Sequence, residues 1–141
     1  MEHSIDEILE HHQLRRTKIR IKMLSIFLDK DYALAHAELE SSIGQDFDRV
    51  TIYRTLKSFE DQGLVHRVLD ESGTAKYALC HHEHNETHKH YDHHIHFNCV
   101  TCGHTYCLDN IPIPEIKLPT AYQLQKLDFL AQGICQKCGD K

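Results

Sequence analysis

Two short cysteine motifs carry the clearest chemical signal in this sequence. Each has the form C-x-x-C-G, at positions 99–103 and 135–139. Two-residue spacing lets both sulfurs of a pair bind one tetrahedral ion, and the following glycine lets the backbone turn tightly beneath them. A thioredoxin-like redox motif is the alternative for a single pair, but it requires a βαβ context that is absent here. We therefore predict one structural zinc site with four thiolate ligands, which are Cys99, Cys102, Cys135 and Cys138.

A second group of potential metal ligands surrounds the first motif. Eight of the fourteen histidines lie between positions 81 and 96. His94 and His96 are two apart on a predicted strand, so both point to one face. Cys107 on the neighbouring strand and Cys80 at the end of the preceding hairpin are placed to complete a site with them. A thiolate with imidazoles suits Zn²⁺ and tolerates Fe²⁺.

Other interpretations of these side chains stay open. Cys107 can instead be a buried apolar thiol, the usual environment of a lone cysteine. Five histidines of the loop can be solvated side chains without a ligand role; they are His81, His82, His84, His88 and His90.

Basic side chains are clustered although the formal net charge is −5. The stretch 13–28 contains five basic residues and no acidic one: Arg15, Arg16, Lys18, Arg20 and Lys22. A further basic group, Arg49, Arg54 and Lys57, lies on another predicted helix. Such local patches can contact phosphates on an otherwise acidic chain. Two solvated helix faces are the alternative.

Apolar periodicity and capping residues predict four helices in the first half of the chain. They cover 4–12, the stretch from Thr17 to about Asp29, then 34–40 and 48–62. Two short strands follow, 64–70 and 74–80, joined by a turn at Glu71-Ser72-Gly73. Helices followed by a hairpin predict a winged helix-turn-helix, with 48–62 as recognition helix and 64–79 as wing. In this geometry the recognition helix enters the major groove of DNA.

The pattern of the second half of the chain predicts a smaller unit of short strands. We predict strands at 94–97 and 105–108 and a third within 124–134, while Pro112, Pro114 and Pro119 interrupt any long helix between 109 and 120. About 50 residues form a small core, so metal and subunit pairing are expected to support it. The expected division is a DNA-binding domain at 1–80, a histidine-rich hinge at 81–92 and a metal-binding dimerisation domain at 93–141.

Several classes of protein are excluded by what the sequence lacks. It has no run of 18 apolar residues, so no membrane span is expected. Its N-terminus has no apolar signal segment, so we expect a cytoplasmic protein whose cysteines are metal ligands or free thiols. It shows no serine–histidine–acid or HExxH pattern, so we expect neither an enzyme nor a site for a small organic substrate.

Together these motifs resemble the ferric uptake regulator (Fur) family of bacterial metal-dependent repressors, from Leu14 to Cys138. The segments that carry the resemblance are LRRTKIRIKML, DRVTIYRTLKSFEDQGLVHRV, HIHFNCVTCG (the H-x-H-x-x-C-x-x-C-G signature) and GICQKCG. The resemblance implies an α+β homodimer with an N-terminal winged helix and a C-terminal α/β dimerisation domain. It also implies that a divalent metal activates binding to a double-stranded, palindromic, AT-rich operator of metal uptake genes.

The resemblance assigns roles to individual residues. The four cysteines match the family's structural zinc site, and His94 and His96 match histidines of its regulatory site at the hinge. Tyr53 matches a DNA-contacting tyrosine, and Arg20 matches a basic residue of the second helix. The predicted DNA contacts are Arg15, Arg16, Arg20, Arg49, Thr51, Tyr53 and Arg54.

Departures from the family pattern concern the regulatory metal. Many members have a histidine where this chain has Ala33, and His36, one turn later, is a possible substitute. Many have an acidic ligand at Ala78, but here Cys80 follows two residues on, as in the zinc-sensing branch, and Cys107 occupies the place of a carboxylate. Two cysteines in place of hard ligands favour Zn²⁺ over Fe²⁺ as the second metal.

Two alternative functions are kept open. One is an iron or peroxide sensor of the same family that uses oxygen ligands from Glu83, Glu86, Asp92 or Asp109. The other is a histidine-rich metal buffer, which predicts many weak sites and no sequence-selective DNA binding.

Overall fold

The chain divides into two compact units, Met1–Cys80 and His81–Lys141, which are called here the N-terminal and C-terminal units. In the computed structural model the described residues are 4–68, 72–79, 95–108, 111, 114–125, 127 and 129–139. The expected hinge at 81–92, with Cys80 and His94, lies outside the described residues.

The N-terminal unit begins with two capped helices, α1 (Ile5–His11) and α2 (Lys18–Asp29). The Ser4 hydroxyl accepts a hydrogen bond from the Glu7 N–H at 3.2 Å, and the Thr17 hydroxyl accepts one from the Arg20 N–H at 3.3 Å. These caps satisfy N–H groups that have no partner inside the helix. Both helices occur where the sequence predicts them.

The third helix begins later than predicted. Leu34–Ala35 forms the short strand β1, and α3 covers His36–Ile43. The Glu38 side chain accepts a hydrogen bond from the Ala35 N–H at 3.0 Å, which fixes the start of the helix. Local helix propensity of this stretch is overridden because β1 pairs with a distant strand, β3 (Lys76–Leu79), with Leu34 opposite Tyr77. A short 3₁₀ turn, Gly44–Asp46, follows α3.

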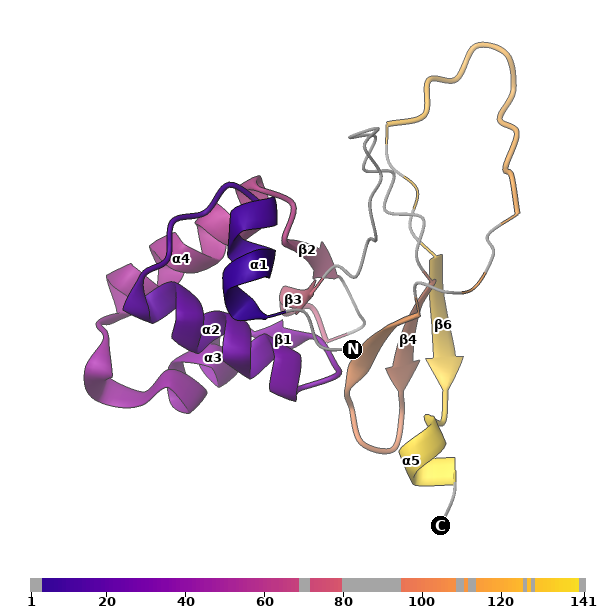
Figure 1. Cartoon of the computed structure of the whole chain (residues 1–141). Coiled ribbons are helices and arrows are strands. Elements are labelled where there is room, and N and C mark those ends of the chain that lie inside the picture. Colours follow the sequence, from indigo (N-terminus) through magenta and orange to yellow (C-terminus); the bar gives the residue numbers. More distant parts are fainter. Residues whose placement is uncertain are drawn as a thin grey trace. The chain divides into compact units, whose positions relative to one another are not determined.

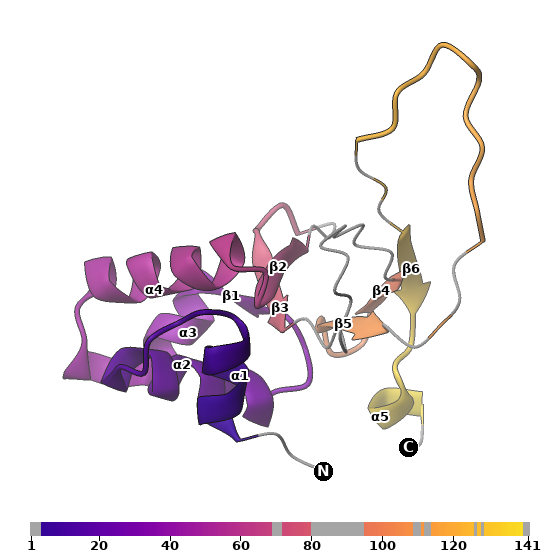
Figure 2. The ribbon, with the colours of Figure 1, turned by 45° about the horizontal axis from the view of Figure 1, so that its top comes forward.

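The fourth helix, α4, covers Arg49–Asp61, with Asp48 as its N-cap. An Asp48 carboxylate oxygen accepts a hydrogen bond from the Thr51 N–H at 2.7 Å. Beyond the helix, Gly63 has a φ of +76°, the left-handed conformation typical of a helix end. Strand β2 (Val65–Val68) then pairs antiparallel with β3, and the sheet order is β1-β3-β2. Helices followed by this hairpin confirm the winged helix-turn-helix (Figures 1 and 2).

One apolar core holds the N-terminal unit together. Helix α2 contacts α1, α3 and α4, and α4 also contacts β2. Leu9, Met23, Leu24, Leu39 and Phe59 are fully buried within this cluster. Because α4 also contacts α3, it is fixed against α2, α3 and β2 rather than held only by its own hydrogen bonds.

The described residues of the C-terminal unit form a three-stranded sheet and one short helix. Its strands are β4 (Ile95–Cys99), β5 (Thr105–Leu108) and β6 (Phe129–Gly133), followed by α5 (Gln136–Gly139). The sheet order is β5-β4-β6; β4 is antiparallel to β5 and parallel to β6. The third strand is shorter than the predicted stretch 124–134. Residues 114–125 contain neither helix nor strand and extend away from the sheet (Figure 1).

Few side chains are buried in the described part of the C-terminal unit. Those below one-tenth exposure are His96, Cys99, Thr105 and Cys135. Because this set contains two cysteines, a histidine and a threonine, the sheet packs around potential metal ligands rather than around an apolar core. No helix in the described ranges of either unit is long and apolar enough to cross a membrane.

Candidate metal centre and nucleic-acid interface

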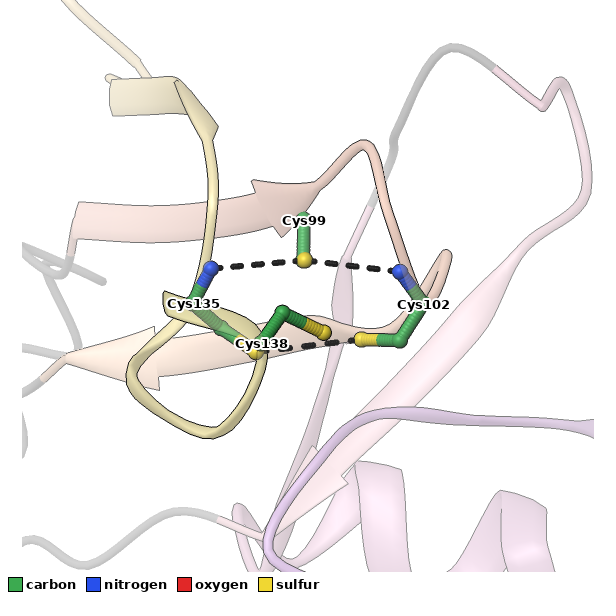
Figure 3. A group of neighbouring side chains, drawn as sticks. All are labelled: Cys99, Cys102, Cys135 and Cys138. Carbon is green, nitrogen blue, oxygen red and sulfur yellow. Dashed lines mark hydrogen bonds between the residues drawn. The ribbon is translucent and has the colours of Figure 1, made fainter. Parts of the chain in front are cut away.

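The four cysteines of the two C-x-x-C-G motifs converge in the C-terminal unit. Cys99 ends β4 and Cys102 lies in the turn that follows it, while Cys135 precedes α5 and Cys138 lies within it. All four sulfurs lie within 4.8 Å of one another (Figure 3). The Sγ atoms of Cys102 and Cys135 are 3.9 Å apart. A tetrahedral zinc with bonds of 2.3 Å separates its sulfurs by about 3.8 Å, so the arrangement fits such an ion.

Backbone geometry prepares Cys99 to act as a thiolate. Its Sγ accepts hydrogen bonds from the N–H groups of Cys102 at 3.5 Å and Cys135 at 3.3 Å (Figure 3). These two bonds lower the pKa of Cys99 to about 5. Burial, followed by the neighbouring cysteine sulfurs, raises the pKa of Cys138 to about 12. Four thiolates this close repel one another, and a divalent cation supplies the charge that lets all four lose their protons.

Tyr106 also lies at this centre, although no sequence motif indicated it. Its hydroxyl donates a hydrogen bond to Cys135 Sγ at 3.7 Å and lies 3.9 Å from Cys102 Sγ. Burial and the contacts with these sulfurs raise the pKa of Tyr106 above its usual value, so the hydroxyl keeps its proton. The contact depends on how β5 pairs with β4, which the sequence alone does not give.

Two residues of the predicted regulatory site face each other across the C-terminal sheet. His96 on β4 is directly opposite Cys107 on β5, and a ring nitrogen of His96 lies within 4.8 Å of Cys107 Sγ. His96 is buried and Cys107 is half-buried. The other two predicted ligands, Cys80 and His94, lie outside the described residues, so their roles stay predictions.

His66 is a buried histidine that the sequence analysis did not select. It lies on β2, opposite Ala78 of β3, which precedes Cys80 by two residues. Its side chain is only 7% exposed, although it lies on a wing strand with an exposed neighbour, Arg67. The available signal was the period of two: within the predicted strand His66 lies two residues from Leu64 and two from Val68, both apolar, so all three share one face.

His36, the suggested substitute ligand, contacts residues of its own unit. Its Nδ1 lies 3.0 Å from a Glu40 carboxylate oxygen, and its ring centroid lies 5.2 Å from that of Tyr53 on α4. Within the described ranges it does not belong to a group of three or more potential metal ligands. Its contacts link α3 to the recognition helix.

Helix α4 presents polar side chains on the face opposite its buried stripe. Ile52, Leu56 and Phe59 are buried, whereas Tyr53 and Arg54 are exposed. A tyrosine that is 57% exposed on a helix beside an arginine offers a surface for base edges and phosphates.

Other predicted DNA-contacting residues lie around this helix or at the start of α2. Arg49 Nε is 3.1 Å from a Glu40 oxygen, and Arg16 Nε is 2.7 Å from an Asp6 oxygen. Arg20 donates a hydrogen bond from its guanidinium to the Arg15 carbonyl oxygen at 2.9 Å. Arg15, Arg16 and Arg49 are exposed, while Arg20 and Thr51 are half-buried.

Fold and site together define a winged-helix protein with a four-cysteine cluster whose geometry fits a structural zinc. Residues 11–129 match the model of the ferric uptake regulator family, and the chain belongs to that family of metal-responsive transcriptional regulators. The ferric uptake regulation protein of Staphylococcus aureus is 29% identical over 138 residues, covering 95% of each chain. That of Staphylococcus epidermidis is 30% identical over 138 residues, covering 94% of this chain and 92% of the relative.

Solved structures share the fold. A zinc uptake regulator complexed with zinc and DNA matches with a TM-score of 0.67 at 22% identity, covering 96% of this chain and 90% of that one. The Helicobacter pylori ferric uptake regulator matches with a TM-score of 0.60 at 17% identity, covering 100% of this chain and 99% of that one. The Vibrio cholerae ferric uptake regulator matches with a TM-score of 0.59 at 21% identity, covering 94% of this chain and 100% of that one. These likenesses confirm the α+β fold class.

Proposed function

We propose that this family member is a dimeric, zinc-activated repressor of metal uptake genes that acts in the cytoplasm. One observation carries the choice of zinc: a buried imidazole, His96, lies opposite a thiol, Cys107, separate from the four-cysteine centre. A thiolate and an imidazole form a softer ligand set than the carboxylates that Fe²⁺ accepts readily, and this favours Zn²⁺.

Each metal has its own role in this proposal. Zinc at the four-cysteine centre has no open coordination position, so its role is structural and not catalytic. The second ion is bound by the ligands that the sequence predicts: His94, His96, Cys107 and Cys80. We rank His36 last because its Nδ1 already contacts Glu40.

Binding of the second ion couples zinc concentration to DNA affinity. Its ligands come from both units, so the ion restricts the angle between the two winged helices of a dimer. Apo protein samples many angles, and metal selects one that matches two half-sites. Helix α4 then places Tyr53 and Arg54 in the major groove, with the remaining predicted basic residues and Thr51 near phosphates or bases.

Exposed apolar side chains support pairing of two copies. In the C-terminal unit large hydrophobic residues are exposed on the sheet, the knuckles and the segment between β5 and β6: Val100, Ile111, Ile116, Leu118, Tyr122, Leu124, Leu130 and Ile134. A surface of this kind on a unit with little apolar core is typical of a subunit interface. We propose a homodimer formed through this unit.

A zinc titration tests the proposed function. Protein that retains one zinc per chain at the four-cysteine centre is titrated with Zn²⁺, and its affinity for an AT-rich palindromic duplex is measured by fluorescence anisotropy. We expect affinity to rise as the second site fills, with no such rise on a scrambled duplex. Unchanged affinity would overturn zinc activation, and many weak zinc sites without selective DNA binding would favour a metal buffer.

Iron sensing is the second candidate. The two Staphylococcus relatives are named ferric uptake regulation proteins, and they cover almost the whole chain. The same titration with Fe²⁺ under anaerobic conditions separates the candidates. Activation by Fe²⁺ at concentrations where Zn²⁺ has no effect would replace the zinc proposal.

A further inference from the structure

We infer that Tyr106 is a positioning residue of the four-cysteine centre, whose hydroxyl donates a hydrogen bond to cysteine sulfur and holds the two knuckles together. The inference rests on the proposed metal occupancy of that centre. It concerns a side chain that is not a metal ligand and belongs to neither C-x-x-C-G motif.

The position of the hydroxyl is specific. It lies 3.7 Å from Cys135 Sγ and 3.9 Å from Cys102 Sγ, so it reaches one sulfur of each knuckle. These two cysteines are 33 residues apart in the chain. A donor placed between them therefore adds a side-chain link between the knuckles to the strand pairing, to the hydrogen bond from the Cys135 N–H to Cys99 Sγ and to the ion.

Strand pairing fixes the place of Tyr106. It is opposite Phe97 on β4, and β4 continues to Cys99. Beside this pair, Asn98 Nδ2 donates a hydrogen bond to the Thr105 hydroxyl oxygen at 3.0 Å, and Thr105 is fully buried. The His104 ring also packs edge-on against the Tyr106 ring, with centroids 6.4 Å apart. The ring is thus held in one orientation by its neighbours.

A hydrogen bond to a thiolate has two consequences for a bound metal. It is charge-assisted, so it is stronger than a bond between neutral groups. It also withdraws electron density from the sulfur and orients it, as partners of metal ligands commonly do. We expect Tyr106 to slow loss of the ion by keeping Cys102 and Cys135 in their metal-binding positions.

The test compares full-length, zinc-loaded wild type with Tyr106→Phe, which keeps the ring and removes only the hydroxyl. Tyr32→Phe is the matched control, because it removes the same group from a residue of the unit that lacks the four cysteines. Zinc transfer to a chromophoric chelator is followed in time. We expect Tyr106→Phe to release zinc roughly two- to tenfold faster, since a net hydrogen bond contributes about 0.5–1.5 kcal/mol. Tyr32→Phe should match wild type.

A spectroscopic readout reports on the sulfur itself. With Co²⁺ in place of zinc, the sulfur-to-cobalt charge-transfer band should move to lower energy in Tyr106→Phe, because sulfur without the hydrogen bond gives up electron density more readily. This band arises only from metal-bound molecules, so partial unfolding of the variant does not obscure it.

A Tyr106→Leu variant separates the hydroxyl from the ring. If Tyr106→Phe matches wild type in release rate and band position while Tyr106→Leu alone releases zinc faster, the ring only packs and the inference is wrong. If wild type itself holds no zinc and gives no thiolate–cobalt band, the proposed metal centre fails instead. The two failures are thus distinguished.

Discussion

At the scale of single residues, the cysteines differ in environment although their spacing makes them look alike. Cys99 is fully buried and accepts two backbone hydrogen bonds, whereas Cys102 of the same motif is exposed. Cys107 lies on a neighbouring strand opposite His96, outside the four-cysteine group. Their chemical roles therefore depend on which backbone and side-chain groups surround each sulfur.

Serine substitutions at two cysteines should separate the two metal sites. Cys99→Ser removes a ligand that the backbone prepares as thiolate, so we expect loss of the zinc retained after purification. The Cys107→Ser variant should keep that zinc and should bind only the second ion more weakly. Inductively coupled plasma mass spectrometry measures the metal content per chain before and after exposure to a mild chelator, and this checks both outcomes. Equal loss of zinc in the two variants would contradict the assignment of Cys107 to a second site.

The recognition helix gives a second prediction at this scale. Arg54→Ala removes an exposed guanidinium beside Tyr53, and we expect operator affinity to fall by about 1–3 kcal/mol, roughly five- to 150-fold. Zinc content should not change, because Arg54 belongs to the unit that lacks the four cysteines.

Lys57→Ala is the matched control for Arg54→Ala. It removes the same charge from the same helix, but the Lys57 ammonium is paired with Asp61 at 3.0 Å. Fluorescence anisotropy on one operator duplex compares the two variants, and a smaller effect is expected for Lys57→Ala. Equal losses would indicate general electrostatic attraction rather than a specific contact.

At the scale of secondary-structure elements, α4 links the proposed DNA-binding surface to the core. Its exposed face carries Tyr53 and Arg54, while Phe59 on the opposite face is fully buried against the other helices. Its other neighbours include α3, whose Glu40 contacts both His36 and Arg49. Position and orientation of the recognition surface therefore depend on buried side chains that never meet DNA.

Phe59→Ala tests that dependence. Removing a fully buried phenylalanine leaves a cavity, and we expect unfolding of the N-terminal unit to become easier by about 3–5 kcal/mol. Val50→Ala is the control, since Val50 is 56% exposed on the same helix and should change stability by less than about 0.5 kcal/mol. Urea unfolding followed by the helical circular dichroism signal measures both. Retention of zinc by Phe59→Ala would show that the effect is confined to its unit.

At the scale of the whole molecule, the two units are stabilised by different means. The large apolar cluster of buried residues lies entirely in the N-terminal unit. In the described part of the C-terminal unit, the buried side chains are two cysteines of the four-cysteine group, His96 and Thr105. We therefore expect metal to be a folding requirement for the C-terminal unit only.

Removing zinc from the intact protein should affect the units unequally. With a strong chelator, we expect amide hydrogen exchange of β4 to β6 to accelerate sharply while the exchange of α2 and α4 changes little. The circular dichroism signal at 222 nm should be largely retained, because α1 to α4 all lie in the N-terminal unit. Return of protection on adding zinc back is the control. Simultaneous loss of protection in α2 and α4 would contradict independent stabilisation.

Much of the fold follows from local signals in the sequence. Ser4, Thr17 and Asp48 each accept a hydrogen bond from a backbone N–H in the first turn of the helix that follows. Where prediction and structure differ, a partner far along the chain is the reason. The sequence predicts that a helix begins at Leu34 and Ala35, but these residues form β1. The reason is that β3, about 40 residues later, provides backbone hydrogen-bonding partners.

The sequence by itself determined the two cysteine knuckles, the winged-helix pattern and the family, because spacing, capping and periodicity are properties of neighbouring residues. Only the tertiary structure decided that Tyr106 reaches the sulfurs of both knuckles, that Cys107 faces His96, and that His66 is buried. Each of these depends on the register of paired strands. Register is set by side chains and backbone groups that meet across a sheet, and linear spacing does not record which residues those are.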